Sequence, residues 1–308
     1  MQTLSRRRFL TIAACAGVFG TRAAADIPVT QWQTTALGAR TTLSLAHSDA
    51  GRVADQVFAE LRRLEGIFSL YRPDSALSRL NRDGRLAAPP FELLECLGLC
   101  DRIHNATGGL FDPTIQPLWA AHAQQHATGK ADPDGIDRAR ALVGWPQVAV
   151  DSQAITLARP GMAITLNGIA QGYIADRIAA LLTRQGLTDL MIDTGELRAL
   201  GGHPQGGDWP VTLETVDGGR SGRVRLRDIS MATSSPAGTQ FDTVAGAGHI
   251  LDPRTGQPGR APWRLVSVTG PSAAVADGLS TAICLMKDRD TIGAALSGFS
   301  DMTLVHLS

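Results

Sequence analysis

The 308-residue chain has little cysteine, few aromatic residues and no excess of charge of either sign. No two of its four cysteines have the CxxC spacing of a zinc or redox site, and no disulfide framework is indicated. The 29 basic and 29 acidic residues balance, whereas nucleic-acid-binding proteins normally carry a basic excess. The composition is therefore that of an ordinary globular protein, and it argues against a nucleic acid as partner.

The N-terminus has the features of a removable export signal. Arg6-Arg7-Arg8 form a twin-arginine pattern before an apolar run from Phe9 to about Gly20, and Ala23-Ala24-Ala25 offers small residues for cleavage. This run is shorter than the roughly 20 residues of a membrane span. We expect residues 1–25 to be a cleaved twin-arginine signal peptide and residues 26–308 to be one periplasmic domain. Cleavage removes four of the 29 basic residues and none of the 29 acidic ones, which leaves a formal charge of −4.

The four cysteines have no predicted catalytic role. Cys15 follows a sequence that faintly resembles a lipoprotein cleavage box, but only about five apolar residues precede it, where a signal normally has about 7–15. A lipid anchor at Cys15 is therefore disfavoured. Cys96, Cys100 and Cys284 lie in apolar patterns and are predicted to be core residues.

The periodicity predicts an α+β domain, because helices and strands mix without regular βαβ alternation. A polar, turn-rich segment is expected over 71–84. Helices are expected over 50–69, 89–105, 113–123, 136–143, 172–184 and 273–286. Strands are expected over 31–46, 148–166, 189–200, 209–215, 222–231, 249–250 and 263–269.

Two aromatic-containing turns have both a binding and a structural interpretation. In Tyr71-Arg72-Pro73-Asp74-Ser75, an aromatic ring beside an arginine suits a flat ring and a phosphate, but Asp74 or Ser75 also suits the cap of a helix. In Gly108-Gly109-Leu110-Phe111-Asp112, backbone, an aromatic face and a carboxylate meet at one bend, which is equally typical of a helix end and a turn. Residue types alone favour the structural interpretation of both.

A third segment, Thr165–Tyr173, predicts a strand that ends in a glycine turn, followed by a helix near Gly172. Free backbone N–H groups at a helix start suit a phosphate. The segment lacks the GxGxxG spacing of a dinucleotide-binding fold, so the signal is weak when taken alone.

The fourth constellation is a pair of oxygen ligands with a nearby histidine. Asp277 and Thr281 are four apart in a predicted helix, so their oxygens face the same side. With a backbone carbonyl from elsewhere, they suit Mg²⁺; the structural alternative is an acidic residue in the first turn and a threonine bonded within its own helix. His249 lies near Asp252 and is either a general base or a hydrogen-bonded histidine.

Together and in order, these phrases resemble the ApbE-type FAD:protein FMN transferases. The resemblance extends over roughly 37–286. Its matching phrases are Ser69–Ser75 with Leu77–Asn81, Gly109–Thr114, Gly168–Tyr173 with Asp176, Ala232–Ser234, His249–Gly256 and the Ala276–Thr281 helix. It implies a single ApbE-like, T-fold-related domain with two lobes around a flavin cleft.

The resemblance also implies a reaction and a set of site residues. Mg²⁺ would bridge the pyrophosphate of FAD, held by the side chains of Asp277 and Thr281 and the carbonyl of Gly168. His249, assisted by Asp277, would deprotonate a Thr or Ser hydroxyl of an acceptor protein, which receives FMN through a phosphoester as AMP leaves. The positions that match flavin-nucleotide contacts are Tyr71, Leu110, Phe111, Asp112, Thr165, Gln171 and Ile250.

Three departures from the family pattern stand out. Family members commonly have Asp at the position of Thr165 and Lys or Glu at that of Gln171, so neutral hydrogen-bonding groups replace charges here. The usual Gly-Gly-Asp is replaced by Asp193-Thr194-Gly195-Glu196-Leu197-Arg198. This variant and the twin-arginine signal resemble the branch associated with nitrous oxide reductase maturation (NosX-like), and the resemblance implies a membrane-bound regulator or electron donor of that system as acceptor.

Two other functions remain open from the sequence. The same metal site would serve a pyrophosphatase that splits FAD into FMN and AMP with water. A non-catalytic periplasmic FAD-binding protein is the second alternative, to which the neutral Thr165 and Gln171 point. Retention of Asp277, Thr281 and His249 favours catalysis, since a binding protein does not need all three.

Overall fold

The computed structural model describes residues 10–12, 27–215, 218–238, 240–242 and 247–308. A seven-stranded sheet forms its centre, and every neighbouring pair of strands in it is antiparallel. In spatial order its strands are β15 (Thr303–Leu307), β14 (Val266–Gly270), β11 (Ser230–Ser234), β8 (Leu197–Leu200), β7 (Leu190–Asp193), β3 (Ala39–Leu45) and β2 (Thr30–Ala36). No helix in the described ranges is long and apolar enough to cross a membrane.

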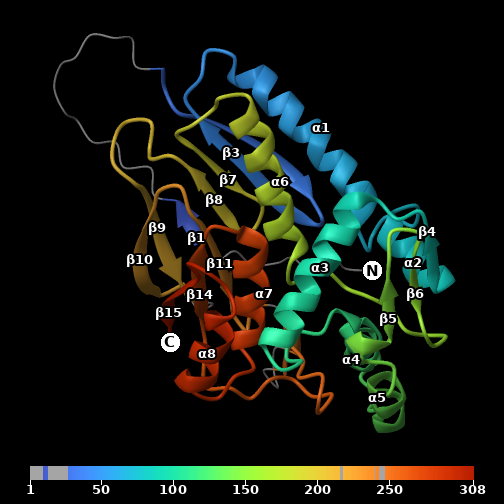
Figure 1. Ribbon diagram of the computed structural model, residues 1–308. Helices are drawn as coiled ribbons and strands as arrows, with labels where there is room; N and C mark the ends of the chain where they lie inside the picture. Colours follow the sequence, from blue (N-terminus) through green and yellow to red (C-terminus); the bar gives the residue numbers. More distant parts are fainter. Residues whose placement is uncertain (1–9, 13–26, 216–217, 239, 243–246) are drawn as a thin grey trace.

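Three helices cover one face of this sheet: α1 (Ala50–Phe68), α6 (Ala170–Arg184) and α7 (Ala273–Ile283). Figure 1 shows α6 in front of β7 and β8, and α7 in front of β11 and β14. The apolar spacing in α1 places Val53, Val57 and Leu61 on one buried stripe. Because α7 is covered on nearly every side, almost all of its residues are buried, including polar ones.

The opposite face of the sheet carries a second apolar cluster beneath the hairpin of β9 (Trp209–Glu214) and β10 (Arg220–Leu226). Alternate residues of β9 are buried, as expected for a strand with one covered face. The short strand β1 (Leu10–Ile12) pairs with the free edge of β9. The remainder of the expected signal peptide, 1–9 and 13–25, and with it Cys15, lies outside the described residues.

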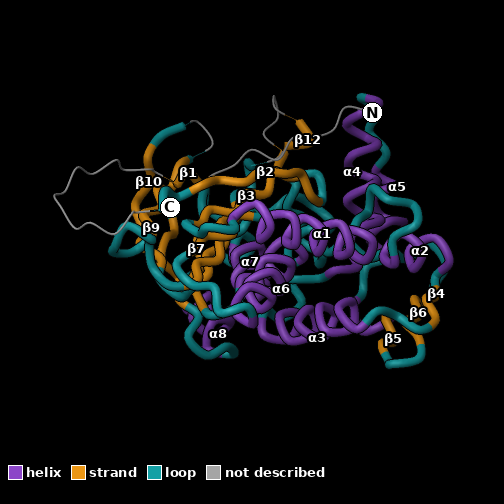
Figure 2. Tube along the Cα trace, turned by 90° about the horizontal axis from the view of Figure 1, so that it is seen from above, coloured by secondary structure: helices purple, strands orange, loops and turns teal. Residues whose placement is uncertain are grey.

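The residues between α1 and α6 form a smaller lobe beside the helical layer (Figure 2). A three-stranded sheet in the order β4-β6-β5 belongs to it. Its elements are α2 (Ala76–Asp83), β4 (Arg85–Ala87), α3 (Phe91–Ala106), the short 3₁₀ turn η1 (Pro113–Ile115), α4 (Gln116–Thr128), α5 (Pro133–Arg140), a second 3₁₀ turn η2 (Trp145–Gln147), β5 (Val148–Val150) and β6 (Ala154–Leu157).

One continuous core joins the lobes: Leu77, Leu93 and Ile155 of the smaller lobe belong to the same buried cluster as Ile178 and Val266 of the larger one. The described residues from 27 on are thus organised as a single α+β domain, and this fold class is the one that the sequence predicts. Cys96, Cys100 and Cys284 are free and fully buried, which confirms their role in the core. The remaining elements are β12 (Gln240–Asp242), β13 (Ala247–Gly248) and α8 (Arg289–Ser297).

Four sequence-based expectations differ from the structure. The strand structure expected over 148–166 ends at Leu157. Ile164 instead bonds to the side chain of Asn81: Nδ2 of Asn81 donates to the Ile164 carbonyl at 2.8 Å, and Oδ1 of Asn81 accepts from the Ile164 N–H at 2.7 Å. The expected strand over 222–231 is two strands, β10 and β11. His249 and Ile250 follow β13 and form no strand. The segment expected to be turn-rich over 71–84 contains α2; Ser75 caps this helix by accepting from the Ser78 N–H, which confirms the structural interpretation of that residue.

The helices α6 and α7 approach closely at Gly172. A Cβ atom on Gly172 would overlap the backbone carbonyl of Ala273. We expect Gly172→Ala to lower the free energy of unfolding by about 1–3 kcal/mol through overpacking, even though alanine favours a helix by about 1 kcal/mol. Gly66→Ala in α1 is the matched control, since nothing lies within 4 Å of the added methyl group. Denaturant unfolding of both variants checks this; equal stabilities would contradict it.

Candidate active site

The start of α6 and the side of α7 bring three predicted site residues together. A Cβ atom placed on Gly168 would lie 3.0 Å from Oγ1 of Thr281 and 3.5 Å from Cε2 of Phe111. The backbone of Gly168 therefore lies against the Thr281 hydroxyl and the edge of the Phe111 ring, although the three residues come from separate segments. A larger residue at position 168 would fill this space.

Asp277 lies one helical turn before Thr281 on α7 and is only 4% exposed. Its Oδ2 faces the first turn of α6 and accepts from the Gly172 N–H at 3.5 Å. The Ser234 hydroxyl, at the end of β11, lies 2.7 Å from Oγ of Ser280 and 3.4 Å from Oγ1 of Thr281. One face of the α6–α7 junction is therefore lined with carboxylate and hydroxyl oxygens.

These oxygen atoms are suitable ligands for a small, hard divalent cation. Mg²⁺ takes oxygen ligands, of which usually one or two are carboxylates, with waters and phosphates completing its shell. The Asp277 carboxylate, the Thr281 hydroxyl and the Gly168 carbonyl form such a set. The described part of the chain has no cluster of three or more His, Cys, Asp and Glu residues.

The turn that carries Leu110 and Phe111 is held by hydrogen bonds. The Phe111 N–H donates to Oγ1 of Thr107 at 3.1 Å, and Nδ1 of His104 lies 2.9 Å from the Phe111 carbonyl oxygen. Phe111 is buried, and Leu110 is half-buried. The Phe111 backbone is therefore held by His104 of α3 and by Thr107 at the end of that helix, two residues that the sequence patterns did not single out as part of a site.

Asp112 and Thr165 belong to the adjoining turn. Oδ1 of Asp112 accepts from the Thr114 N–H at 2.8 Å and its hydroxyl at 2.5 Å, and Oδ2 accepts from the Trp145 N–H at 3.2 Å. Thr165 is joined to this turn because its N–H donates to the Pro113 carbonyl at 2.8 Å. The structural interpretation of Asp112 as a turn residue is confirmed, and its contact with a nucleotide stays a prediction.

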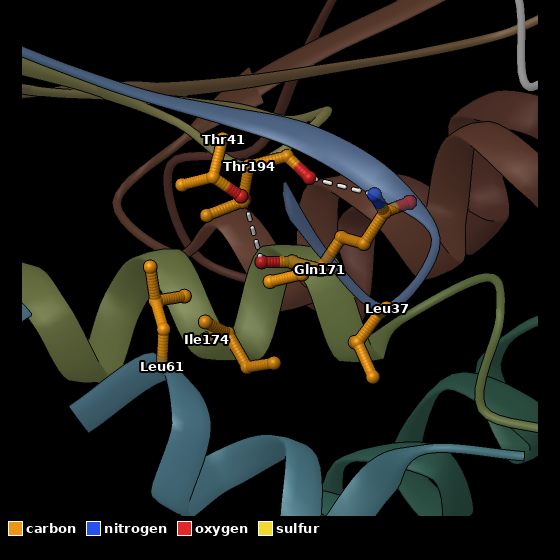
Figure 3. A pocket seen from close by; sticks show the side chains of 7 residues that line it. Leu37, Thr41, Leu61, Gln171, Ile174 and Thr194 are labelled. Carbon is orange, nitrogen blue, oxygen red and sulfur yellow. Dashed lines mark hydrogen bonds between the residues drawn. The ribbon is translucent and has the colours of Figure 1, made fainter. Parts of the chain in front are cut away.

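Gln171 is hydrogen-bonded to the loop between β7 and β8, which is the centre of the variant segment 193–198 (Figure 3). Its Nε2 donates to the Thr194 carbonyl at 2.6 Å, and the Thr194 hydroxyl donates to the Gln171 carbonyl at 2.9 Å. In the same loop Glu196 is buried, and its carboxylate accepts from the Thr233 N–H at 3.2 Å. The neutral residue at 171 and the variant loop are thus structurally coupled.

The small hollow in Figure 3 is not a flavin site. It is lined by Leu37, Thr41, Leu61, Gln171, Ile174 and Thr194, with Ala36 beside them, and leaves essentially no room for a water molecule. The hydroxyl of Thr41 is buried there without a hydrogen-bond partner among the described residues. The hollow is a packing defect between α1, α6 and β3.

His249 and Ile250 follow β13 and lead into a loop against the end of α7. Gly248 packs on the backbone of Pro236, just beyond β11, and His249 is half-buried. The carbonyl of Ile250 accepts from the Gly259 N–H at 2.9 Å, and Gly259 lies against Leu285 and the Cys284 carbonyl. This arrangement ties the histidine segment to both elements that line the oxygen-rich face, β11 and α7.

The Asp252 carboxylate accepts hydrogen bonds from Arg254 of the same loop. Burial alone would raise the pKa of its carboxyl, but hydrogen bonds from the Arg254 guanidinium and N–H hold that pKa below its usual value. Asp252 is therefore an ionised partner of Arg254. On the other side of the loop, the Gly256 carbonyl lies 2.8 Å from Nε2 of His122 on α4.

Tyr71 belongs to a different element, the segment between α1 and α2. Its side chain is 67% exposed, and its ring lies against Gly38 in the β2–β3 turn. An exposed aromatic ring is available to stack on a flat ligand. The structure thus gathers Gly168, Thr281, Phe111 and Asp277 at one junction, whereas Tyr71 is presented from the β2–β3 side.

Solved structures with the same fold are flavin transferases. The flavin transferase ApbE from Vibrio cholerae superimposes with a TM-score of 0.75 over 91% of this chain and 98% of that one, at 24% identity. The apo form of flavinyl transferase ApbE from Pseudomonas stutzeri gives 0.74 over 87% and 88%, at 27% identity. The antiparallel seven-stranded sheet and its helical layer are therefore those of this class of protein.

Sequence comparisons define the family. The ApbE family model matches residues 30–298. The Treponema pallidum protein named FAD:protein FMN transferase is 31% identical, covering 74% of this chain and 69% of that protein. A protein of the same name from Haemophilus influenzae is 25% identical, covering 83% and 80%. The chain belongs to the ApbE family and is a transferase enzyme of the flavinyltransferase class.

Proposed function

We propose that this protein is a Mg²⁺-dependent FAD:protein FMN transferase that attaches FMN through a phosphoester to a Thr or Ser of an exported or membrane-bound acceptor. The observation that carries this proposal is the junction of Gly168, Asp277 and Thr281, where the buried carboxylate and the hydroxyl of α7 lie beside the turn that precedes α6. The relatives named FAD:protein FMN transferase support the choice of donor and acceptor.

The reaction is a phosphoryl transfer, in which positioning and charge stabilisation provide most of the catalysis. The acceptor hydroxyl oxygen forms a bond to the FMN phosphorus of FAD, the phosphoanhydride bond breaks, and AMP leaves with the bridging oxygen. His249 takes the hydroxyl proton. Asp277, Thr281 and the Gly168 carbonyl would hold the Mg²⁺ ion, which when bound supplies positive charge against the pyrophosphate. The turn fixed by Thr107 and His104 presents Phe111 beside the same site.

We also propose a location and a physiological acceptor. The twin-arginine pattern and the Ala-Ala-Ala site support export of residues 26–308 to the periplasm. The 193–198 variant supports the branch associated with nitrous oxide reductase maturation, with a membrane-bound regulator or electron donor of that system as acceptor. Two residues of this variant are hydrogen-bonded to elements of the candidate site: Glu196 to β11 and Thr194 to α6.

An acceptor-dependence experiment tests the transferase against its alternatives. The mature protein is incubated with FAD, Mg²⁺ and a periplasmic acceptor domain that carries the threonine-containing flavinylation motif, with a Thr→Val acceptor as the matched control. We expect fluorescent, covalently bound FMN in the threonine acceptor and none in the valine one. Free FMN and AMP in both samples would identify a pyrophosphatase, and intact FAD throughout would identify a binding protein.

A further inference from the structure

A carboxylate of α6 holds the beginning of α7. Oδ2 of Asp176 accepts from the Ser272 hydroxyl at 2.8 Å and from the Ala274 N–H at 3.0 Å, and Oδ1 accepts from the Ala273 N–H at 2.9 Å. The first N–H groups of a helix have no partner within the helix. Asp176 therefore supplies from a neighbouring helix the acceptors that α7 lacks.

This contact lies between the two halves of the oxygen-rich site. Gly168 is two residues before α6, and Asp277 and Thr281 are on α7. Asp176 and Gly172 are both on α6, one turn apart, and both contact Ala273. Since side chains four apart share a helix face, a single face of α6 fixes the start of α7. The distance from the Gly168 carbonyl to Asp277 and Thr281 depends on how α7 is held along that face.

Arg198, on β8 at the end of the variant segment 193–198, provides a positive charge beside Asp176. Its Nε lies 3.8 Å from Oδ1 of Asp176, and its side chain is 16% exposed. Nε and Nη1 are buried without a hydrogen-bond partner among the described residues, so this guanidinium acts on Asp176 as a charge. Burial raises the pKa of Asp176, and the α7 N–H groups, the Ser272 hydroxyl and Arg198 oppose that shift.

We propose that Asp176 is a positioning residue of the metal site: by clamping the start of α7 to α6, it sets Asp277 and Thr281 against the Gly168 carbonyl. The proposal rests on the proposed Mg²⁺-dependent function. Asp176 is not one of the proposed metal ligands, and its effect is exerted through the placement of α7. Removal of a residue that orients metal ligands typically weakens metal affinity by about 10–100-fold.

The test compares Asp176→Ala with Asp288→Ala in the mature full-length protein. Asp288 caps α8 by accepting from the Thr291 N–H at 2.8 Å, so its removal also deprives a helix of its cap, but α8 carries none of the predicted ligands. Two quantities are measured: the Mg²⁺ concentration for half-maximal transfer, and the increase in Tm that Mg²⁺ produces in the presence of FAD. A ligand that binds only the folded state raises Tm.

We expect Asp176→Ala to raise the half-saturating Mg²⁺ concentration by about 10-fold or more and to reduce the Mg²⁺-induced increase in Tm. Asp288→Ala should lower Tm without Mg²⁺ but change neither quantity. If Asp176→Ala does not fold, Asp176→Asn, which keeps one acceptor oxygen, should show a smaller shift in the same direction. If the Asp176 and Asp288 variants have the same half-saturating Mg²⁺ concentration and the same Mg²⁺-induced increase in Tm, the positioning role of Asp176 is wrong. If the wild-type protein transfers FMN without Mg²⁺, the proposed function itself is wrong.

Discussion

Replacing Asp277 by alanine is expected to abolish Mg²⁺-dependent FMN transfer, with a loss of at least about a thousandfold. The physical reason is that Asp277 is the only carboxylate in the proposed ligand set, so its loss removes the anionic ligand that holds the cation against the pyrophosphate. Charge stabilisation by a metal contributes several kcal/mol, and each 1.36 kcal/mol is about tenfold in rate. The initial rate of covalent FMN incorporation into the acceptor measures the effect.

Two further variants separate the ligand role from general damage to the fold. Asp277→Asn keeps the size of this buried side chain but not its charge, so we expect it to be nearly as inactive as the alanine variant while it retains the wild-type Tm more closely. Asp290→Ala, in the exposed first turn of α8, should transfer FMN normally. Normal Mg²⁺-dependent transfer by Asp277→Ala would show that the metal ligands have been wrongly assigned.

His249→Ala is expected to slow transfer by about 10²–10⁴-fold, the usual contribution of a well-placed general base. FAD affinity should be preserved, because the imidazole acts on the acceptor hydroxyl and not on the nucleotide. The decrease should therefore appear in kcat with FAD saturating, and FAD fluorescence titration should give the wild-type Kd.

The control for this variant is His203→Ala, which removes a half-buried imidazole that packs on Trp209 under the β9–β10 hairpin. We expect its transfer rate to match that of the wild type. A His249→Ala variant with an unchanged kcat would mean that another group takes the hydroxyl proton.

The fold could be predicted wherever local patterns and tertiary structure agree. The stripe in α1, the strand structure over 31–46 and the apolar helix α7 were predicted within a few residues of their observed bounds. The break between β10 and β11 was missed because Asp228 makes the turn with a φ of 50°, and no glycine or proline marks it. The pairing of residue 164 with Asn81 was equally hidden, since 83 residues separate them.

The site could be predicted only as separate pieces. The i, i+4 spacing correctly placed Asp277 and Thr281 on one helix, but no local pattern says that Gly168 lies against Thr281, because that contact arises from the packing of α6 on α7. His104 and Thr107 gave no signal, since their role is to hold the Phe111 backbone. Asp176 belongs to one of the segments that match the family, but its bond to Ser272, which caps α7, is visible only in the structure.

The most direct test of the central claim is the balance of products from FAD, with and without Mg²⁺. Mature protein, FAD and acceptor domain are incubated with Mg²⁺ or with a chelator, and intact-protein mass spectrometry of the acceptor is combined with quantification of AMP. The proposed function predicts one AMP released for each FMN bound to the acceptor, and neither product when Mg²⁺ is chelated. AMP released in step with free FMN from an unmodified acceptor, or transfer that persists in the chelator, would contradict it.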